Sequence, residues 1–369
     1  MKKSIKKSNN NINRLLQVTK ELIKDCSLEN GGIVAANSTK INYSAVAKNY
    51  FYVWPRDASF TCIASDVLGI NDVPENFFSW CLERAEGFSK NGLFYEKYYP
   101  NGLKALANFQ PDQTGAVLFA LWHHYKEDID KASKFHKLVK IAAKGICNVW
   151  EKDHFTQVTN DLWEERFCFP DLNENFSYSL ASCIKGLECA NKLVPNERWI
   201  KTADEMKNRL GMHFINNIGY FVRSCGELVD RRIDASILGL VYPFEVYGAN
   251  DRGIKSSIKE IEKKLLINGG IHRYEHDEYD GWMYETLHRK KGAGAWPLLN
   301  FWMSIYYSIK GDKKKAEKYY WWVLKKIGDK YYLPEQIFEN DKQVSVSPLL
   351  WSHSMFVLAS EHLGFLDKT

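Results

Sequence analysis

The sequence lacks the features that would send a chain into or across a membrane. No apolar run approaches the ~18 residues that a membrane-spanning helix needs. The basic start is followed by the polar run 8–14, where a secretory signal would have an uninterrupted apolar stretch. A cytoplasmic protein with no membrane partner is therefore predicted.

The sequence also lacks a disulfide or metal-binding pattern. Its eight cysteines are dispersed, form no CxxC pair and mostly stand among apolar neighbours in helical surroundings. Buried free thiols in a reducing compartment are expected, and a zinc site is not.

Positive charge is scarce beyond the first residues. Lys2, Lys3, Lys6 and Lys7 supply four of the net charge of +5, so little remains to form a basic face. The lysines at 313–315 stand beside Glu317, which is typical of a solvated helix face. Nucleic acid is therefore not expected as a partner.

What the chain does have is apolar, helical periodicity over most of its 369 residues, 45% of which are hydrophobic. About twelve helices are predicted, near 11–26, 56–69, 74–88, 111–126, 130–151, 174–193, 195–214, 233–240, 251–266, 294–310, 312–327 and 349–364. Helix pairs alternate with long aromatic segments, and no linker rich in Ser, Pro or Gly divides the chain. This pattern predicts a disordered basic tail at 1–10 and one closed array of helical hairpins over 11–369.

Loops longer than about 12–15 residues in a compact domain are usually functional. Such segments are expected at 27–55, 91–110, 152–173, 267–293 and 328–348. Several tryptophans fall in or beside them, namely Trp54, Trp163, Trp282 and Trp296. Aromatic faces in a cleft stack on sugar rings, and a core position is the other role open to each of these residues.

Arg56 and Asp57 stand at a predicted loop-to-helix junction after the aromatic run 50–54. An acid at such a place can cap the helix. A guanidinium next to a carboxylate can instead bind two neighbouring hydroxyls in a fixed orientation. Both roles fit the sequence.

Glu164 and Glu165 are adjacent carboxylates inside an aromatic loop. An acid in an apolar wall beside a second negative charge has a raised pKa and can stay protonated near neutral pH, as a general acid must. Arg166 would oppose this effect. Spacing alone does not decide which of the two carboxylates donates the proton.

Glu335 follows Leu333 and Pro334 in another long loop, which the proline stiffens. A single Glu in a loop is often only solvated. Two carboxyl groups far apart in the sequence are nevertheless what glycoside hydrolysis needs, provided that their loops meet.

Six short motifs in order resemble the catalytic domain of glycoside hydrolase family 15, the glucoamylases with their glucodextranase and trehalase relatives. The motifs are Trp54-Pro55-Arg56-Asp57, Gln110-Pro111-Asp112-Gln113-Thr114-Gly115, Asp161-Leu162-Trp163-Glu164-Glu165, Gly270-Ile271-His272-Arg273-Tyr274, Leu333-Pro334-Glu335-Gln336 and Pro348-Leu349-Leu350-Trp351-Ser352-His353. The resemblance covers roughly residues 33 to 360. The resemblance implies an all-α fold, an (α/α)6 toroid of six inner and six outer helices with long active-site loops.

The resemblance also implies roles for single residues. Glu164 is similar to the general acid and Glu335 to the general base of the family. Arg56 and Asp57 resemble the clamp on the terminal glucose, Glu165 and Arg273 further binding residues. Trp54, Trp163 and Trp296 are similar in position to cleft aromatics. Tyr274, Asp112 and His353 match the pattern, and each can be structural or functional.

The implied activity is that of an inverting, exo-acting, glucoamylase-like glucosidase, a hydrolase of carbohydrate metabolism that degrades alpha-linked glucans. The resemblance implies that no metal and no cofactor is required. Its carboxyl groups should lie about 6.5–9.5 Å apart to admit a water. The Trp54 motif comes too early for an N-terminal β-sandwich, and no starch-binding module is expected, so soluble oligosaccharides are the expected substrates. Self-association as a homo-oligomer is a further expectation, because it could cover the surface left bare.

Two kinds of alternative stay open at this stage. An intracellular trehalase or an alpha-1,6-glucosidase like glucodextranase would use the same residues. A non-catalytic glucan-binding or regulatory toroid is the alternative of another class, although such a protein need not keep both Glu164 and Glu335.

Overall fold

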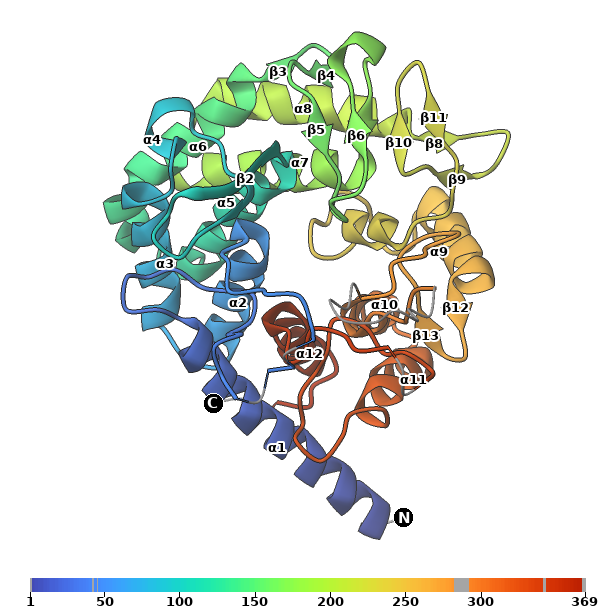
Figure 1. Cartoon of the computed structure of the whole chain (residues 1–369). Helices are drawn as coiled ribbons and strands as arrows, with labels where there is room; N and C mark the ends of the chain where they lie inside the picture. Colours follow the sequence, from blue (N-terminus) through green and yellow to red (C-terminus); the bar gives the residue numbers. More distant parts are fainter. Residues whose placement is uncertain (1, 42, 45, 282–291, 341–342, 367–369) are drawn as a thin grey trace.

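The structure is a computed structural model that describes residues 2–366, except for residues 42, 45, 282–291 and 341–342. Its helices form a closed ring seen end-on in Figure 1. The twelve α-helices of the described residues are α1 (Lys2–Cys26), α2 (Pro55–Val67), α3 (Asp72–Glu83), α4 (Phe88–Asn91), α5 (Pro111–Tyr125), α6 (His136–Asn148), α7 (Ser177–Leu193), α8 (Glu197–Gly211), α9 (Arg252–Lys264), α10 (Pro297–Ile309), α11 (Lys313–Leu324) and α12 (Leu350–His362). Three 3-10 helices join them: η1 (Ile129–Phe135), η2 (Pro170–Leu172) and η3 (Ala235–Leu240).

The inner ring is built by helices that each pack against the next. The order of contact is α2, α5, α7, η3, α10, α12 and back to α2. The outer helices α3, α6, α8, α9, α11 and α1 pack behind these in turn. This is the predicted (α/α)6 toroid, with the short helix η3 in one inner position.

The inner helices are buried nearly all round, whereas the outer ones bury a single face. Almost every residue of α2, α5, α7, α10 and α12 is buried, polar ones included. The outer helix α9 buries only a stripe of five residues (Gly253, Ile254, Ser257, Ile258 and Ile261). A continuous apolar pattern and a helical stripe are the sequence signals of these two environments.

Close packing of the inner ring depends on glycine where α5 crosses α7. A Cβ atom on Gly115 would lie 2.4 Å from the carbonyl oxygen of Ser182, and one on Gly186 would lie 2.7 Å from the Cα of Gly115. Any larger residue would force the helices apart.

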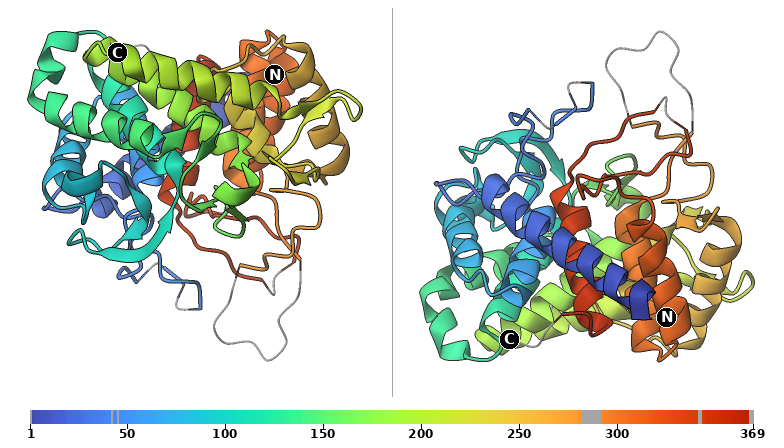
Figure 2. Two further views of the ribbon diagram at one scale, coloured as in Figure 1. Left: turned by 90° about the horizontal axis from the view of Figure 1, so that it is seen from above. Right: turned by 90° about the horizontal axis from the view of Figure 1, so that it is seen from below.

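Short antiparallel strands lie in the segments that connect the helices. The longest pair is β1 (Tyr95–Tyr98) with β2 (Lys104–Phe109), in which Tyr95 pairs with Phe109 and Tyr98 with Lys104. The others are β3 (Trp150–Glu151), β4 (His154–Phe155), β5 (Thr159–Asn160), β6 (Phe167–Cys168), β7 (Asn175–Phe176), β8 (Phe214–Ile215), β9 (Tyr220–Phe221), β10 (Ser224–Cys225), β11 (Val229–Asp230), β12 (Leu266–Ile267) and β13 (Gly270–Ile271). Many of the long connections gather on one side of the helical ring (Figure 2).

The N-terminal helix differs from the prediction, because α1 includes residues 2–10, where a disordered tail is expected from the sequence. Neither Gly nor Pro occurs between Met1 and Cys26, so nothing in the local sequence ends the helix there. All eight cysteines are free and buried, as predicted. Within the described residues, every helix is too short or too polar to span a membrane.

Candidate active site

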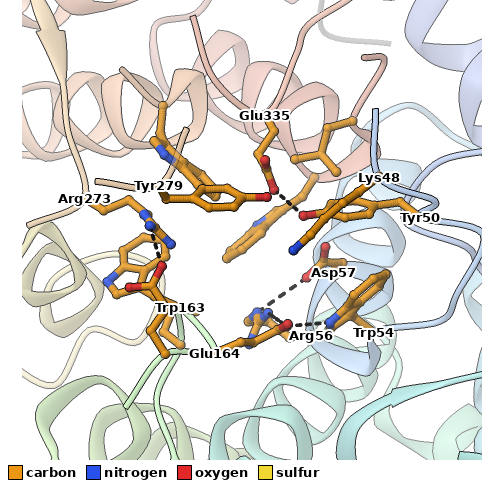
Figure 3. A pocket seen from close by; sticks show the side chains of 15 residues that line it. Lys48, Tyr50, Trp54, Arg56, Asp57, Trp163, Glu164, Arg273, Tyr279 and Glu335 are labelled. Carbon is orange, nitrogen blue, oxygen red and sulfur yellow. Dashed lines mark hydrogen bonds and ion pairs between the residues drawn. The ribbon is translucent and has the colours of Figure 1, made fainter. Parts of the chain in front are cut away.

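A cavity of about 340 Å³ opens where the N-terminal ends of inner helices meet the long loops (Figure 3). Its walls come from six separate segments of the sequence. They are formed by Lys48, Tyr50, Trp54, Arg56, Asp57, Leu162, Trp163, Glu164, Glu165, Arg273, Tyr279, Trp296, Glu335, Leu349 and Trp351. Helix N-termini carry partial positive charge, so the ends of α2, α10 and α12 favour negative charge or oxygen lone pairs nearby.

Arg56 and Asp57 lie in the first turn of α2, which begins at Pro55 because proline fits the first helical position without losing a hydrogen bond. The guanidinium of Arg56 is 3% exposed and bonds Asp112 Oδ2 at 3.0 Å. Its Nε lies 3.4 Å from Asp57 Oδ1. Burial raises the pKa of Asp57 to about 6, although Arg56 lowers it.

Asp112 is itself fully buried and is not part of the cavity wall. It lies in the first turn of α5, which also begins with proline. Its carboxylate and the amide oxygen of Gln110, 3.3 Å away, both accept from Arg56 Nη1. Asp112 therefore fixes the position of the Arg56 guanidinium.

Glu164 stands at the tip of a turn that Asp161 organises. The side chain of Asp161 accepts hydrogen bonds from the backbone N–H of Glu165 at 2.8 Å and of Arg166 at 3.1 Å. Its carbonyl oxygen accepts from Glu164 N at 3.1 Å. The turn places Glu164 in the left-handed region at φ 62°, which is uncommon for a residue with a side chain and marks a constrained position.

The surroundings of Glu164 favour its protonated form. Burial and the nearby carboxylate of Glu96 raise the pKa of Glu164 from 4.5 to about 8, and Lys97 and Arg56 lower it in part. The indole Nε1 of Trp54 donates to Glu164 Oε1 at 2.5 Å. A carboxyl group with this pKa keeps its proton at neutral pH and can donate it.

Glu335 lies in a loop that α12 anchors. The backbone N–H of Leu333 donates to His353 Nε2 at 2.9 Å, and Ser352 Oγ donates to the carbonyl oxygen of Pro334 at 2.8 Å. Glu335 N donates to Val346 O at 2.8 Å. Because Leu333 donates to Nε2, the ring of His353 carries its proton on Nδ1, next to Thr19 Oγ1 at 2.9 Å. His353 is thus a structural residue here.

The carboxyl group of Glu335 is 4% exposed and faces the cavity from the side opposite Glu164 (Figure 3). Tyr50 Oη donates to its Oε1 at 2.7 Å. Burial raises the pKa of Glu335, while Tyr50, Arg273 and Lys48 act to lower it. Among the described residues, Oε2 accepts no hydrogen bond.

Arg273 forms the third wall and is 2% exposed. Asp277 holds it through two bonds of 2.8 Å, and its Nη2 donates to Glu165 Oε1 at 2.6 Å. The guanidinium lies 5.5 Å from the ring of Trp163 and 5.0 Å from that of Trp296. This wall therefore offers a fixed cation next to two aromatic faces.

Nine of the eleven site residues predicted from the sequence line this one cavity. Asp112 and Tyr274 do not, because the first supports Arg56 and the hydroxyl of the second bonds Glu165. Arg166, expected to oppose the raised pKa of the acid, lies 3.6 Å from Asp230 instead. Trp282 lies outside the described residues.

The sequence does not assign a site role to six cavity residues, namely Lys48, Tyr50, Leu162, Tyr279, Leu349 and Trp351. Tyr50 belongs to the alternation Tyr50, Tyr52, Trp54, which is a signal of an extended segment that shows aromatic rings on one side. Trp351 stands inside one of the six motifs. Lys48 and Tyr279 carry no such local signal.

No three His, Cys, Asp or Glu side chains come close enough to hold a metal ion in the part of the chain that the structure describes. The chemistry of the cavity is that of two carboxyl groups facing each other among aromatic rings and arginines. Two carboxyl groups on opposite sides of one pocket are the arrangement that glycoside hydrolysis uses.

Comparison with known proteins agrees with this class. The family model of glycosyl hydrolases family 15 matches residues 10–361, so the chain belongs to that family. An uncharacterized glycosyl hydrolase of Methanocaldococcus jannaschii is 31% identical over 94% of this chain, which spans 56% of that protein. An isomaltose glucohydrolase of Kribbella flavida is 21% identical over 85% of both chains, and trehalase 2 of Sulfolobus acidocaldarius is 24% identical over 67% of this chain and 47% of its own length.

Solved structures share the fold. A wild-type glycosidase superposes with a TM-score of 0.78 at 19% identity, over 96% of this chain and 98% of that one. A bacterial glucoamylase in complex with acarbose has a TM-score of 0.70 at 20% identity, over 93% of this chain and 55% of that one. The toroid predicted from the sequence is thereby confirmed.

Proposed function

We propose that this protein is an inverting, exo-acting glucosidase that releases beta-glucose from the non-reducing ends of soluble alpha-linked gluco-oligosaccharides. The observation that carries the proposal is the pair of unlike carboxyl groups across one cavity. Glu164, with a pKa of about 8, is the general acid. Glu335, hydrogen-bonded by Tyr50, is the general base.

The reaction follows from these positions. Protonated Glu164 gives its proton to the glycosidic oxygen as the bond to C1 breaks. Glu335 takes a proton from the water that attacks C1 from the opposite face, through Oε2, which accepts no hydrogen bond from the described residues. Water in place of an enzyme nucleophile inverts the configuration, so the alpha-linked sugar leaves as beta-glucose.

The remaining cavity residues bind the terminal sugar. Arg56 and Asp57 present donors and acceptors to neighbouring hydroxyls on one side, and Arg273 with Glu165 does so on the other. A cavity of about 340 Å³ lies at the small end of the ~300–1,000 Å³ range of ligand pockets, which suits the end of a chain better than its middle. Trp163 and Trp296 supply the apolar faces.

A second candidate of the same chemistry acts on trehalose or on alpha-1,6 bonds. The isomaltose glucohydrolase and the trehalase among the relatives support it, and it uses the same residues. The linkage is decided by the second sugar site. The predicted cytoplasmic location and self-association stay predictions.

Proton NMR in the first minutes of reaction tests the proposal. Purified protein is mixed with maltotriose, isomaltose and trehalose, and both the sugar consumed and the anomer released are read. Beta-glucose from maltotriose is the expected result. Alpha-glucose would exclude inversion, consumption of another sugar would reassign the linkage, and no reaction would favour a glucan-binding role.

A further inference from the structure

A second cavity of about 260 Å³ adjoins the first at Glu164. The two cavities share Lys48, Tyr50, Trp54 and Glu164. The rest of the second wall comes from Asn49 and Tyr52 and from the hairpin β1–β2, which contributes Lys97, Tyr99, Ala105 and Leu106. Asp57 and Glu335 line only the first cavity.

Glu164 therefore lies between two compartments of the site, which are the first and the second cavity. On the proposed function, its proton goes to the oxygen that joins the terminal sugar to the next group. The terminal sugar occupies the compartment with Asp57 and Glu335. The second compartment accordingly receives the leaving group.

The second compartment has an unusual charge for a site that binds a neutral sugar. Its wall carries two ammonium groups, Lys48 and Lys97, and Glu164 as the one acid among the described lining residues. Because Glu164 must be protonated to act, the described lining residues present a leaving group with two cations and with no ionised carboxylate. Glu96 lies behind Lys97 at 3.5 Å, is 3% exposed and also accepts a bond of 2.7 Å from Asn108.

The lysines are held beside aromatic rings. Lys97 Nζ lies 5.0 Å from the ring of Trp54 and 5.7 Å from that of Tyr52. Lys48 Nζ lies 5.3 Å from the ring of Tyr279 on the opposite side, and its amine points into the space between the two carboxyl groups (Figure 3). Burial lowers the pKa of Lys48, and the carboxylates of Glu335 and Glu164 raise it. An anion bound nearby would act in the same direction as these carboxylates.

The same wall can hold a sugar ring. The rings of Tyr52 and Tyr99 lie 5.5 Å apart, and Tyr99 is 46% exposed at the outer edge. Aromatic faces accept the apolar face of a sugar, and ammonium groups bind phosphate or carboxylate oxygens by charge-assisted hydrogen bonds. The compartment thus combines a stacking surface with an anion-binding edge.

We propose that the preferred substrate is an alpha-glucoside whose leaving sugar carries an anionic group, a phosphate or a carboxylate, which Lys97 and Lys48 bind. The inference rests on the proposed function and narrows its substrate class. Water and the glycoside give glucose and the anionic sugar, with the proton of Glu164 on the leaving oxygen and a proton of water on Glu335.

Matched substrates test the inference. The value of kcat/KM is compared for maltose, maltose phosphorylated at C6 of its reducing glucose, and maltobionate, and likewise for trehalose and trehalose 6-phosphate. An anionic member should exceed its neutral partner by roughly tenfold or more, the size expected of a charged hydrogen bond. Whether phosphate or carboxylate gives the larger ratio identifies the group, and added salt should reduce the ratio.

Lys97→Met should bring the anionic-to-neutral ratio close to one. Lys104→Met is the control, because Lys104 lies on the same hairpin, over the ring of Tyr95 at 3.8 Å, and lines neither cavity. Hydrolysis of neutral sugars with equal or better kcat/KM than their anionic partners would overturn the inference and leave the proposed function intact. An anionic preference that persists in both Lys97→Met and Lys48→Met would also overturn it. No hydrolysis of any pair would remove the proposed function and this inference together.

Discussion

The two walls of the catalytic cavity hold their carboxyl groups by different means. Glu164 is at the tip of a turn with φ 62°, fixed by Asp161, and receives one indole hydrogen bond. Glu335 sits in an extended loop that is tied to α12 through His353 and receives a tyrosine hydroxyl. The neighbour of Glu164 that affects its pKa most is an acid, Glu96, whereas Arg273 and Lys48 are the charged neighbours of Glu335.

This difference gives the two carboxyl groups of one cavity unlike surroundings, as the proposed roles of acid and base require. Burial raises the pKa of both. A like charge adds to the effect of burial at Glu164, and cations with a hydroxyl donor counteract it at Glu335. On the proposed mechanism, the neighbours and not the residue type therefore distinguish the acid from the base.

The largest loss of turnover is expected when the proposed general base is removed. Glu335→Gln keeps the shape of the side chain but cannot take a proton from water. We expect turnover to fall by roughly 10²–10⁴-fold on every substrate, with binding of a glucose-like inhibitor retained. Steady-state kinetics with calorimetric binding would check this, and Glu339→Gln in the same loop is the control. Near-normal turnover would remove Glu335 from the mechanism.

Replacement of the acid should have a more selective effect. Glu164→Gln cannot protonate the leaving oxygen, so disaccharide hydrolysis should fall about as far, roughly 10²–10⁴-fold. Alpha-glucosyl fluoride needs no proton on its leaving group and should lose much less. Rates on the two substrates, measured side by side, give the test. An equal loss on both would contradict the assignment of Glu164 as acid.

The neighbours of Glu164 can be tested by the sign of their effect. Because its pKa is about 8, kcat/KM should fall as the pH rises through about 8 and the acid loses its proton. Glu96→Gln removes a negative charge and should move this limb to lower pH by about one unit. Lys97→Met removes a positive charge and should move it to higher pH. Shifts in the same direction for both variants would show that at least one of the two charges does not act on Glu164 as expected.

The sequence predicts those parts of the fold and of the site that depend on local contacts. It does not predict the parts that depend on contacts between distant segments. Helix positions are local, so most predicted ranges agree with the observed helices to within about three residues. The exceptions are α1, which begins earlier than predicted, α3, which ends at Glu83 before the short helix α4, and α6, whose predicted first turns form the 3-10 helix η1. The motifs gave Glu164, Glu335 and the arginines. The placement of Lys48 and Tyr279 against Glu335 depends on loops packing across the ring, and no spacing in the sequence encodes that. Asp112 likewise matches a motif, and only the structure shows that its carboxylate fixes the position of Arg56.

The smallest expected effect concerns His353, which anchors the loop that carries Glu335. His353 is buried and neutral, with a pKa lowered from 6.5 to about 3 by burial. Below pH 6.5 His353 binds a proton in the unfolded chain but not in the folded chain. The free energy of unfolding therefore falls as the pH drops from about 6.5 towards 3. The linkage amounts to about 2 kcal/mol of unfolding free energy at pH 5.

His353→Gln should remove this part of the pH dependence in urea unfolding between pH 7 and pH 5. His213 offers a matched comparison, since burial lowers its pKa to about 3 as well and its Nδ1 lies 2.8 Å from Ser177 Oγ, away from Glu335. Both variants should flatten the stability curve. Only His353→Gln should also lower turnover, by a few-fold, because the amide of Leu333 then loses its ring acceptor and the loop that carries Glu335 is less firmly positioned. Equal turnover in the two variants would mean that α12 supports the fold of this wall but does not position its carboxylate.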